Sequence, residues 1–315
     1  MANILTVAIV QASPVYNNLP ASLEKAVALV GEAARMGAKL VAFGECWLAG
    51  YPAWLDHSPN AALWNHEPTK EVFARMRQNS IVVGSAETEI LANAARENNL
   101  TIVIGANERV DRGIGNGTLY NSLLTFSETG KLVNHHRKLV PTYTERLVHG
   151  QGDGDGLNAV ETEIGRVGGL VCWEHWMPLA RQAMHNQGEQ IHIAVYPTVH
   201  EMHQIASRQY AFEGRCFVLA VGLIMAARDL PGEFTPPANT GEAANSLVLR
   251  GGSCLIAPDG SFIIEPVFDE ETILTAEIDL SVIDREKMTL DVSGHYARAD
   301  VFDFRVNRHL RRNDS

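Results

Sequence analysis

Short apolar segments alternate with helix-like segments along almost the whole chain, and this alternation constrains the fold more than any other feature. The first apolar segment is Ile4–Val10, and an Ala-, Leu- and Glu-rich stretch follows at about 21–36, ending at Gly37. Gly commonly follows a helix because it adopts the left-handed conformation without strain. Further strands are expected at about 39–43, 101–107, 119–127, 131–136, 167–171, 191–196, 217–222, 252–257, 262–266 and 273–278.

The expected helices lie between these strands, at about 69–79, 86–98, 177–187, 200–213 and 280–288. No change of composition marks a linker, and no repeat of fixed period occurs. Hydrophobic residues make up 46% of the chain, which is enough to form a sizeable core at this length. The sequence therefore predicts one α/β domain with layered sheets over residues 1–315.

Charge and cysteine usage narrow the classes of partner. The formal net charge of −11 argues against nucleic acid and anionic membrane surfaces as partners. Ile4–Val10 is too short to span a bilayer and follows no Lys or Arg, so we interpret it as a buried strand and not a signal peptide. The four cysteines form no C-x-x-C pair, which predicts a reducing, cytoplasmic setting without disulfides.

Motifs for metals and nucleotides are missing from the sequence. His200 and His203 are three residues apart, but they form no H-E-x-x-H motif and no second ligand cluster accompanies them. The chain contains no phosphate loop of the G-x-x-x-x-G-K-[ST] type and no G-x-S-x-G motif. We therefore expect neither a metal nor an organic cofactor.

Three short segments each place a reactive group at, or just after, the end of an expected strand. Glu45 lies in F-G-E-C-W, Lys138 in H-R-K-L-V-P-T and Cys172 in V-C-W-E-H-W. Strand ends are common positions for functional groups, because rigid strands hold the group while loops shape the pocket.

Taken one at a time, these residues have ordinary explanations. Cys172 at the end of an apolar strand could be a small buried hydrophobe, and Glu45 could form a structural salt bridge. Glu145 could either orient Lys138 or form a surface pair with Arg146. Together they form a coherent set, because a thiol must be ionised to attack and a buried carboxylate can serve as its base. Lys138 could then stabilise the negative charge that develops on the substrate.

The three segments, in this order, resemble the nitrilase family of carbon–nitrogen hydrolases. Its F-P-E-x-F/W…G-Y-P, H-R-K-L-x-P-T-x-x-E-R and C-W-E motifs match around Glu45, Lys138 and Cys172, and G-H-Y-A-R-A-D at 294–300 resembles a further family block. The resemblance covers most of the chain. It implies a four-layer αββα sandwich and a catalytic Glu45–Lys138–Cys172 triad, with Glu145 as a fourth member. Two positions differ from the family pattern. Gly44 stands where the family usually has Pro, and His149 stands where an aromatic residue is common.

The resemblance also implies a reaction. C-W-E after the nucleophile favours the nitrilase branch, whose members convert an organic nitrile to a carboxylic acid and ammonia. Amidases of the same fold and cyanide-hydrolysing enzymes are the near alternatives, and a non-catalytic binding protein is a remote one. We further expect a homodimer or larger homo-oligomer, with the tail at about 290–315 at a subunit interface.

Aromatic residues near the triad suggest the nature of the substrate. All five tryptophans lie close to the three segments, and apolar, aromatic pockets hold small organic ligands. We therefore expect an apolar aryl or aliphatic nitrile, although some of these rings could equally belong to the core or to a subunit interface. The residues expected to bind substrate are Tyr51, Trp54, His149, Trp173 and Glu174.

Overall fold

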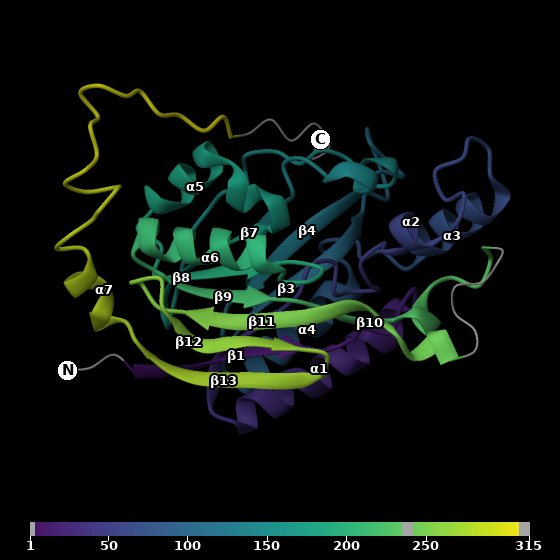
Figure 1. Cartoon of the computed structure of the whole chain (residues 1–315), viewed down its shortest axis with the longest axis horizontal. Coiled ribbons are helices and arrows are strands. Elements are labelled where there is room, and N and C mark those ends of the chain that lie inside the picture. Colours follow the sequence, from purple (N-terminus) through teal and green to yellow (C-terminus); the bar gives the residue numbers. More distant parts are fainter. Residues whose placement is uncertain (1–3, 235–241, 309–315) are drawn as a thin grey trace.

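Two β-sheets lie face to face in the computed structural model, which describes residues 4–234 and 242–308 (Figure 1). Helices cover the outer face of each sheet, so the layers follow the order helix, sheet, sheet, helix. The predicted αββα sandwich is confirmed.

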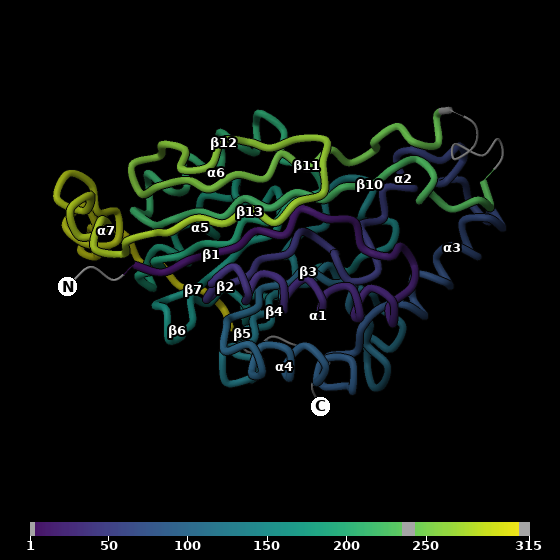
Figure 2. The backbone as a smooth tube through the Cα atoms, turned by 90° about the horizontal axis from the view of Figure 1, so that it is seen from below, coloured from purple at the N-terminus to yellow at the C-terminus, as the bar shows by residue number. Residues whose placement is uncertain are grey.

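The first sheet has six strands and contains the N-terminal strand of the chain. Strands β1, β2 and β3 are parallel to one another, while β13, β4 and β5 pair antiparallel with their neighbours. Figure 2 shows helices α1 and α4 on the outer side of this sheet. In sheet order the strands are β13 (Thr272–Asp279), β1 (Ile4–Gln11), β2 (Ala38–Phe43), β3 (Thr101–Arg109), β4 (Leu119–Phe126) and β5 (Leu132–Arg137); the helices are α1 (Leu19–Arg35) and α4 (Ala86–Asn98).

The second sheet has seven strands, with β7, β8 and β9 parallel at its centre. Helices α5 (Pro178–His185) and α6 (Glu201–Gly214) pack on its outer side. Its strands are β10 (Ile224–Ala226), β11 (Leu247–Ile256), β9 (Phe217–Val221), β8 (Ile191–Val195), β7 (Gly165–Val171) and β6 (Val160–Thr162) in sheet order, and β12 (Phe262–Phe268) pairs with β11.

Strand β1 shows how the sequence separates two hydrophobic cores. Ala8 and Val10 pack in the core under α1 and α4, whereas Val7 and Ile9 pack in the core between the two sheets. Successive side chains of a strand point to opposite faces, so a strand buried on both faces needs a continuous apolar run. Each fully buried Val or Ile contributes roughly 1.5–3 kcal/mol relative to an exposed one.

The structure also contains short elements that we did not predict. They are α2 (Trp54–His57), β10 and the 3₁₀ helices at Tyr143–Leu147, Cys172–Trp176, Ala227–Asp229 and Glu242–Asn245. Helices α3 (Glu67–Gln78) and α7 (Ser281–Glu286) confirm the helices expected at about 69–79 and 280–288, with shifted or shorter bounds.

The described part of the C-terminal tail, 290–308, forms no helix or strand. Phe304 and Val306 pack against the hydrophobic core that contains the second sheet, and the Arg308 Nη2 atom donates to the carbonyl oxygen of Leu157 at 2.9 Å. The tail therefore folds back onto its own chain at this end, and its place at a subunit interface stays a prediction. No helix in residues 4–234 or 242–308 is both long and apolar enough to cross a membrane.

Candidate active site

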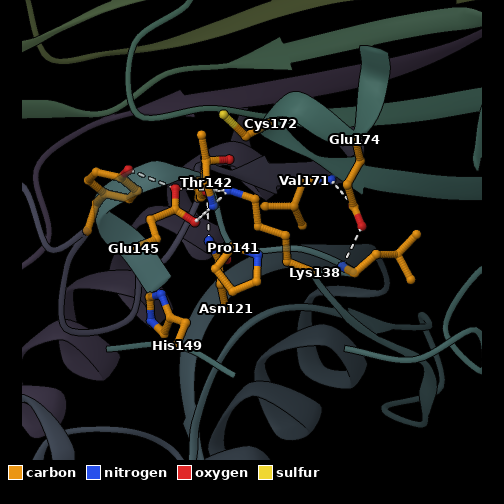
Figure 3. A network of polar contacts seen from close by, with 12 residues as sticks. Asn121, Lys138, Pro141, Thr142, Glu145, His149, Val171, Cys172 and Glu174 are labelled. Atoms are coloured by element: carbon orange, nitrogen blue, oxygen red, sulfur yellow. Dashed lines mark hydrogen bonds and ion pairs between the residues drawn. The ribbon is translucent and has the colours of Figure 1, made fainter. Parts of the chain in front are cut away.

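The three predicted reactive groups come from two sheets and meet between them. Glu45 follows β2 and Lys138 follows β5 in the first sheet, while Cys172 follows β7 in the second. All three side chains are almost completely buried. Figure 3 shows Cys172, Lys138 and Glu145 close together.

Glu45 lies in a tight turn that β3 approaches closely. A Cβ atom on Gly105 would lie 2.2 Å from the carbonyl oxygen of Gly44, so only glycine fits at position 105. The Leu48 N–H donates to the carbonyl oxygen of Gly105 at 3.0 Å and fixes the turn against the strand. A Cβ atom on Gly44 itself would lie 2.7 Å from Leu223 Cδ2, so this position, where the family usually has Pro, is also tightly packed.

Lys138 lies between two carboxylates. Its Nζ atom is 2.9 Å from Glu45 Oε1 and 2.8 Å from Glu145 Oε2. The Asn121 amide donates to Glu45 Oε1 at 2.7 Å, and the Tyr51 hydroxyl donates to Glu145 Oε1 at 2.8 Å. We call these five residues the charged network. The interpretation of Glu145 as a surface partner of Arg146 is wrong, because Glu145 is 1% exposed and binds Lys138.

The two carboxylates of this network differ in their pKa. Burial raises the pKa of Glu45 to about 7, although the charge of Lys138 opposes the shift. Burial also acts to raise the pKa of Glu145, but the charge and hydrogen bonds of Lys138 outweigh it, and the net shift is downward. Glu145 therefore stays ionised, whereas Glu45 can exchange a proton near neutral pH. Glu45 Oε2 has no hydrogen-bond partner among the described residues.

Cys172 starts a 3₁₀ helix directly after β7, with a φ of 54°. This left-handed conformation is uncommon for a residue other than Gly, and strained residues of this kind cluster at functional sites. Burial raises the pKa of the Cys172 thiol well above its ordinary value, and the charge of Glu45 raises it further. The thiol is thus protonated at rest and needs a base to form the thiolate.

Comparison with known proteins identifies the family of the chain. The carbon–nitrogen hydrolase family matches residues 6–287. A protein called Nitrilase 2, from an unknown prokaryotic organism, is 40% identical over 306 residues, covering 96% of this chain and 93% of the relative. An aliphatic nitrilase from Sinorhizobium fredii is also 40% identical, covering 94% of this chain and 93% of the relative.

The chain belongs to the carbon–nitrogen hydrolase family. A solved structure of a carbon–nitrogen hydrolase from Helicobacter pylori has the same fold, with a TM-score of 0.69 at 19% identity, covering 94% of this chain and 96% of that one. The predicted family is therefore confirmed, and with it a hydrolase of carbon–nitrogen bonds.

The residues expected to bind substrate in this carbon–nitrogen hydrolase take different positions. Tyr51 belongs to the charged network, in which its hydroxyl donates to Glu145. His149 is 5% exposed, lies beside Glu145 and has a hydrogen bond from its Nε2 atom to Asn107 Oδ1 at 2.9 Å. Burial lowers the pKa of His149 to about 4, so this ring is neutral.

The two tryptophans expected at the substrate site differ in exposure. Trp173, next to Cys172, is 54% exposed and meets the His203 ring edge-on. Trp54 is buried in the core, stacked on Phe234. Trp47 is also fully buried and donates from its indole N–H to the carbonyl oxygen of Ala12. A substrate contact by Trp173 or Trp54 stays a prediction.

Glu174 turns away from the thiol (Figure 3). Its carboxylate accepts hydrogen bonds from the backbone N–H groups of Leu139 at 2.8 Å and Val171 at 2.7 Å, and it pairs with His136 at 2.8 Å. Glu174 is 1% exposed and thereby ties the residue after Lys138 to the residue before Cys172. The geometry favours a role in holding the two segments together over the expected substrate contact.

Sequence reasoning missed Asn121, which lies on β4. Its side chain donates to Glu45, and its backbone carbonyl oxygen accepts from the Lys138 N–H at 2.8 Å, so it contacts two members of the predicted triad. The available signal was a polar pair, Asn121–Ser122, within a mostly apolar strand that is buried along its whole length. Among the described residues, no group of three or more His, Cys, Asp or Glu side chains could hold a metal ion.

Proposed function

We propose that this protein is a nitrilase, which converts an organic nitrile to the carboxylic acid and ammonia through covalent intermediates on Cys172. The observation that carries the proposal is the contact of Lys138 with both Glu45 and Glu145 next to the buried Cys172 thiol. The two relatives at 40% identity, one called Nitrilase 2 and the other an aliphatic nitrilase, support the choice of a nitrile.

In the first half of the reaction, Glu45 takes the thiol proton and the Cys172 sulfur adds to the nitrile carbon. Glu45 passes this proton on to the nitrile nitrogen, and the product is a thioimidate. Glu45 suits this step because its pKa of about 7 lets it accept a proton near neutral pH and give it up again. Lys138 stabilises the negative charge that develops on the nitrogen.

In the second half, water adds to the thioimidate carbon and ammonia leaves, so that a thioester remains. A second water, deprotonated by Glu45, attacks the thioester carbon. The C–S bond breaks, the carboxylic acid leaves and the thiol regains its proton. Thiol, acid and base supply every step, so the scheme needs no metal or organic cofactor.

The substrate class that we propose is an apolar aryl or aliphatic nitrile. The exposed Trp173 ring next to the nucleophile supports an apolar substrate, since aromatic side chains hold small organic ligands well. The relative called an aliphatic nitrilase supports the aliphatic part of this range.

Ammonia release from matched nitriles and amides tests the proposal. The pairs are phenylacetonitrile with phenylacetamide and butyronitrile with butyramide, followed by mass spectrometry of acid-quenched enzyme. We expect turnover of a nitrile and an acyl mass on the peptide that contains Cys172. Turnover of the amides alone would assign the protein to the amidase alternative, and an acyl group on another residue would refute the mechanism.

We also propose that the chain forms a homo-oligomer and that its tail takes part in the contact. Met288, Tyr296, Val301 and Phe302 are each more than half exposed, which is unusual for large apolar side chains so close together in sequence. Sedimentation of the full chain beside a chain ending at residue 287 tests this. An unchanged oligomeric state would refute the role of the tail.

A further inference from the structure

A continuous row of buried polar side chains leads from the nucleophile into the second sheet. His175 Nδ1 lies 2.7 Å from the carbonyl oxygen of Cys172, and His175 Nε2 lies 2.9 Å from His192 Nε2. His192 Nδ1 lies 2.8 Å from Glu189 Oε1, and the Tyr210 hydroxyl donates to Glu189 Oε2 at 2.6 Å. These four side chains, which we call the histidine chain, are each 3% exposed or less.

The carbonyl oxygen at the start of the histidine chain fixes the direction of its hydrogen bonds. A carbonyl can only accept, so His175 Nδ1 must carry the hydrogen. In a neutral ring His175 Nε2 is then an acceptor, and His192 Nε2 must donate to it. His192 Nδ1 accepts in turn, which requires a proton on Glu189. Moving that proton onto His192 leaves the donation to Cys172 unchanged.

The environment favours the neutral form of the histidine chain. Burial raises the pKa of Glu189 to about 8, so this carboxyl holds its proton at neutral pH. Burial lowers the pKa of both His175 and His192 well below the ordinary value, so both rings are uncharged. Each inner member of the chain then has a partner on both sides, as buried polar groups require.

Holding the Cys172 carbonyl also fixes the N–H group on the other side of the same peptide bond. That N–H belongs to Trp173, and the peptide plane makes the two groups point in opposite directions. It lies in the first turn of the 3₁₀ helix, where backbone donors have no partner within the helix. The strained φ of Cys172 needs support from its surroundings, and the hydrogen bond from His175 supplies it.

We propose that His175 is a positioning residue that aims the Trp173 N–H at the anion formed on the substrate when the Cys172 thiolate adds to it. His192 and Glu189 act one step further away, because they keep His175 in the tautomer that donates to the carbonyl. The inference rests on the proposed function, since it assumes a thiolate attack that produces such an anion. It adds a backbone donor to the charge stabilisation by Lys138.

Two substitutions of His175 separate positioning from a structural role. In H175N the amide Nδ2 can replace ring Nδ1 as donor to the carbonyl, whereas in H175Q the amide reaches the place of Nε2 and the carbonyl loses its donor. H175N loses the hydrogen bond to His192 and H175Q loses the hydrogen bond to the Cys172 carbonyl, so both should lose thermal stability. We expect kcat of H175N within about threefold of wild type and a roughly 10- to 100-fold fall in kcat for H175Q, with little change in KM.

A second pair of variants acts at the far end and decides the question if H175Q does not fold. E189Q can still donate to His192 and accept from Tyr210, so it should keep kcat within about threefold. E189L removes both interactions and should lower kcat. Met184 provides a matched control, because it is fully buried in the same core and M184A removes no hydrogen bond. M184A should lower the melting temperature with kcat unchanged.

Acetylation of Cys172 by p-nitrophenyl acetate provides a readout that does not depend on nitrile turnover. The sulfur bonds to the acetyl carbon, the ester C–O bond breaks, p-nitrophenolate leaves and Glu45 takes the thiol proton, so an oxyanion forms on the way. We expect wild type and H175N to react alike and H175Q to react more slowly.

The outcomes separate the two proposals. Equal rates for H175N and H175Q in both assays would overturn the inference, as would equal rates for E189Q and E189L. A wild type that hydrolyses no nitrile but shows the expected order of acetylation would refute the nitrilase assignment and keep the inference. No nitrile hydrolysis together with no acetylation above the rate of C172A would overturn both.

Discussion

Two buried polar networks meet at Cys172, and they differ in charge. The charged network around Lys138 comes from the first sheet and its loops, and its carboxylates are held close to an ammonium group. The histidine chain comes from the second sheet and its helices. It is neutral, because its hydrogen bonds require a protonated Glu189 and burial raises the pKa of that carboxyl to about 8. Ion pairs are costly to bury, and the charged network holds them where charge develops in the reaction, whereas the histidine chain supports the Cys172 carbonyl with neutral groups.

The largest effect on either network should come from removing the thiol at which they meet. C172A should lower nitrile turnover by at least ~10³-fold while both networks and the fold stay intact, as expected when a nucleophile is lost. Turnover, circular dichroism and the melting temperature check this. Turnover of C172A above one hundredth of wild type would show that another group performs the attack and that the two networks serve something else.

A Glu-to-Gln substitution in each network makes the same chemical change with opposite expected results. E45Q removes the base and should lower kcat by about 10³-fold, because members of a catalytic unit are each needed. E189Q keeps its hydrogen bonds and should change kcat by less than about threefold. Rates for both variants at equal enzyme concentration are the measurement. An equal fall in kcat for E45Q and E189Q would contradict the assignment of a reacting role to the charged network and a supporting role to the histidine chain.

The dependence of stability on pH sharpens the same comparison. Glu189 has a pKa of about 8 when folded and an ordinary value of 4.5, so its favourable contribution is complete below pH 4.5 and is lost as pH rises through about 8. E189Q cannot ionise, so its free energy of unfolding at pH 9 should be larger than that of wild type. The difference should be on the order of 1.4 kcal/mol for each unit by which folding raises the pKa of Glu189. Denaturant unfolding at pH 5 and pH 9 checks it.

Activity should follow the carboxylate of the charged network. Because Glu45 must be ionised to accept the thiol proton, kcat/KM should rise with pH through about 7. E189Q should show the same rise of kcat/KM with pH. If the pH at which kcat/KM rises differs in E189Q, the titrating group belongs to the histidine chain.

The sequence predicted the charged network better than the histidine chain, and the reason is physical. Glu45 stands out because a carboxylate just after an apolar strand is unusual and needs a partner, whereas Lys138 was found through its motif and its order in the chain relative to Glu45 and Cys172. His175, His192 and Glu189 are spread over a 3₁₀ helix, a strand and a turn, and a His within an apolar run has no pattern that names its partner. Their link depends on how β7 and β8 pair, which only the structure reveals.

The fold followed from the sequence for a similar reason. Strands such as β1 and β7 are long apolar runs, and helices such as α1 and α6 have clear ends, so their positions were predicted to within a few residues. The short elements α2 and β10 were missed because three or four residues carry no period. Glu174 was expected at the substrate, but its neighbours His136 and Val171 come from two strands that the sequence does not bring together.

The smallest effects should come from the tyrosine at the outer end of each network. Y51F removes a charge-assisted hydrogen bond to buried, ionised Glu145, so it should change how Lys138 is held and lower kcat by roughly three- to tenfold. Y210F removes a hydroxyl from a buried pair with Glu189, which should cost about 1–3 kcal/mol of unfolding free energy and change kcat by less than about twofold. Steady-state kinetics and denaturant unfolding of both variants give the two numbers for each. A fall in kcat for Y210F larger than that for Y51F would mean that the supporting and reacting networks have been assigned the wrong way round.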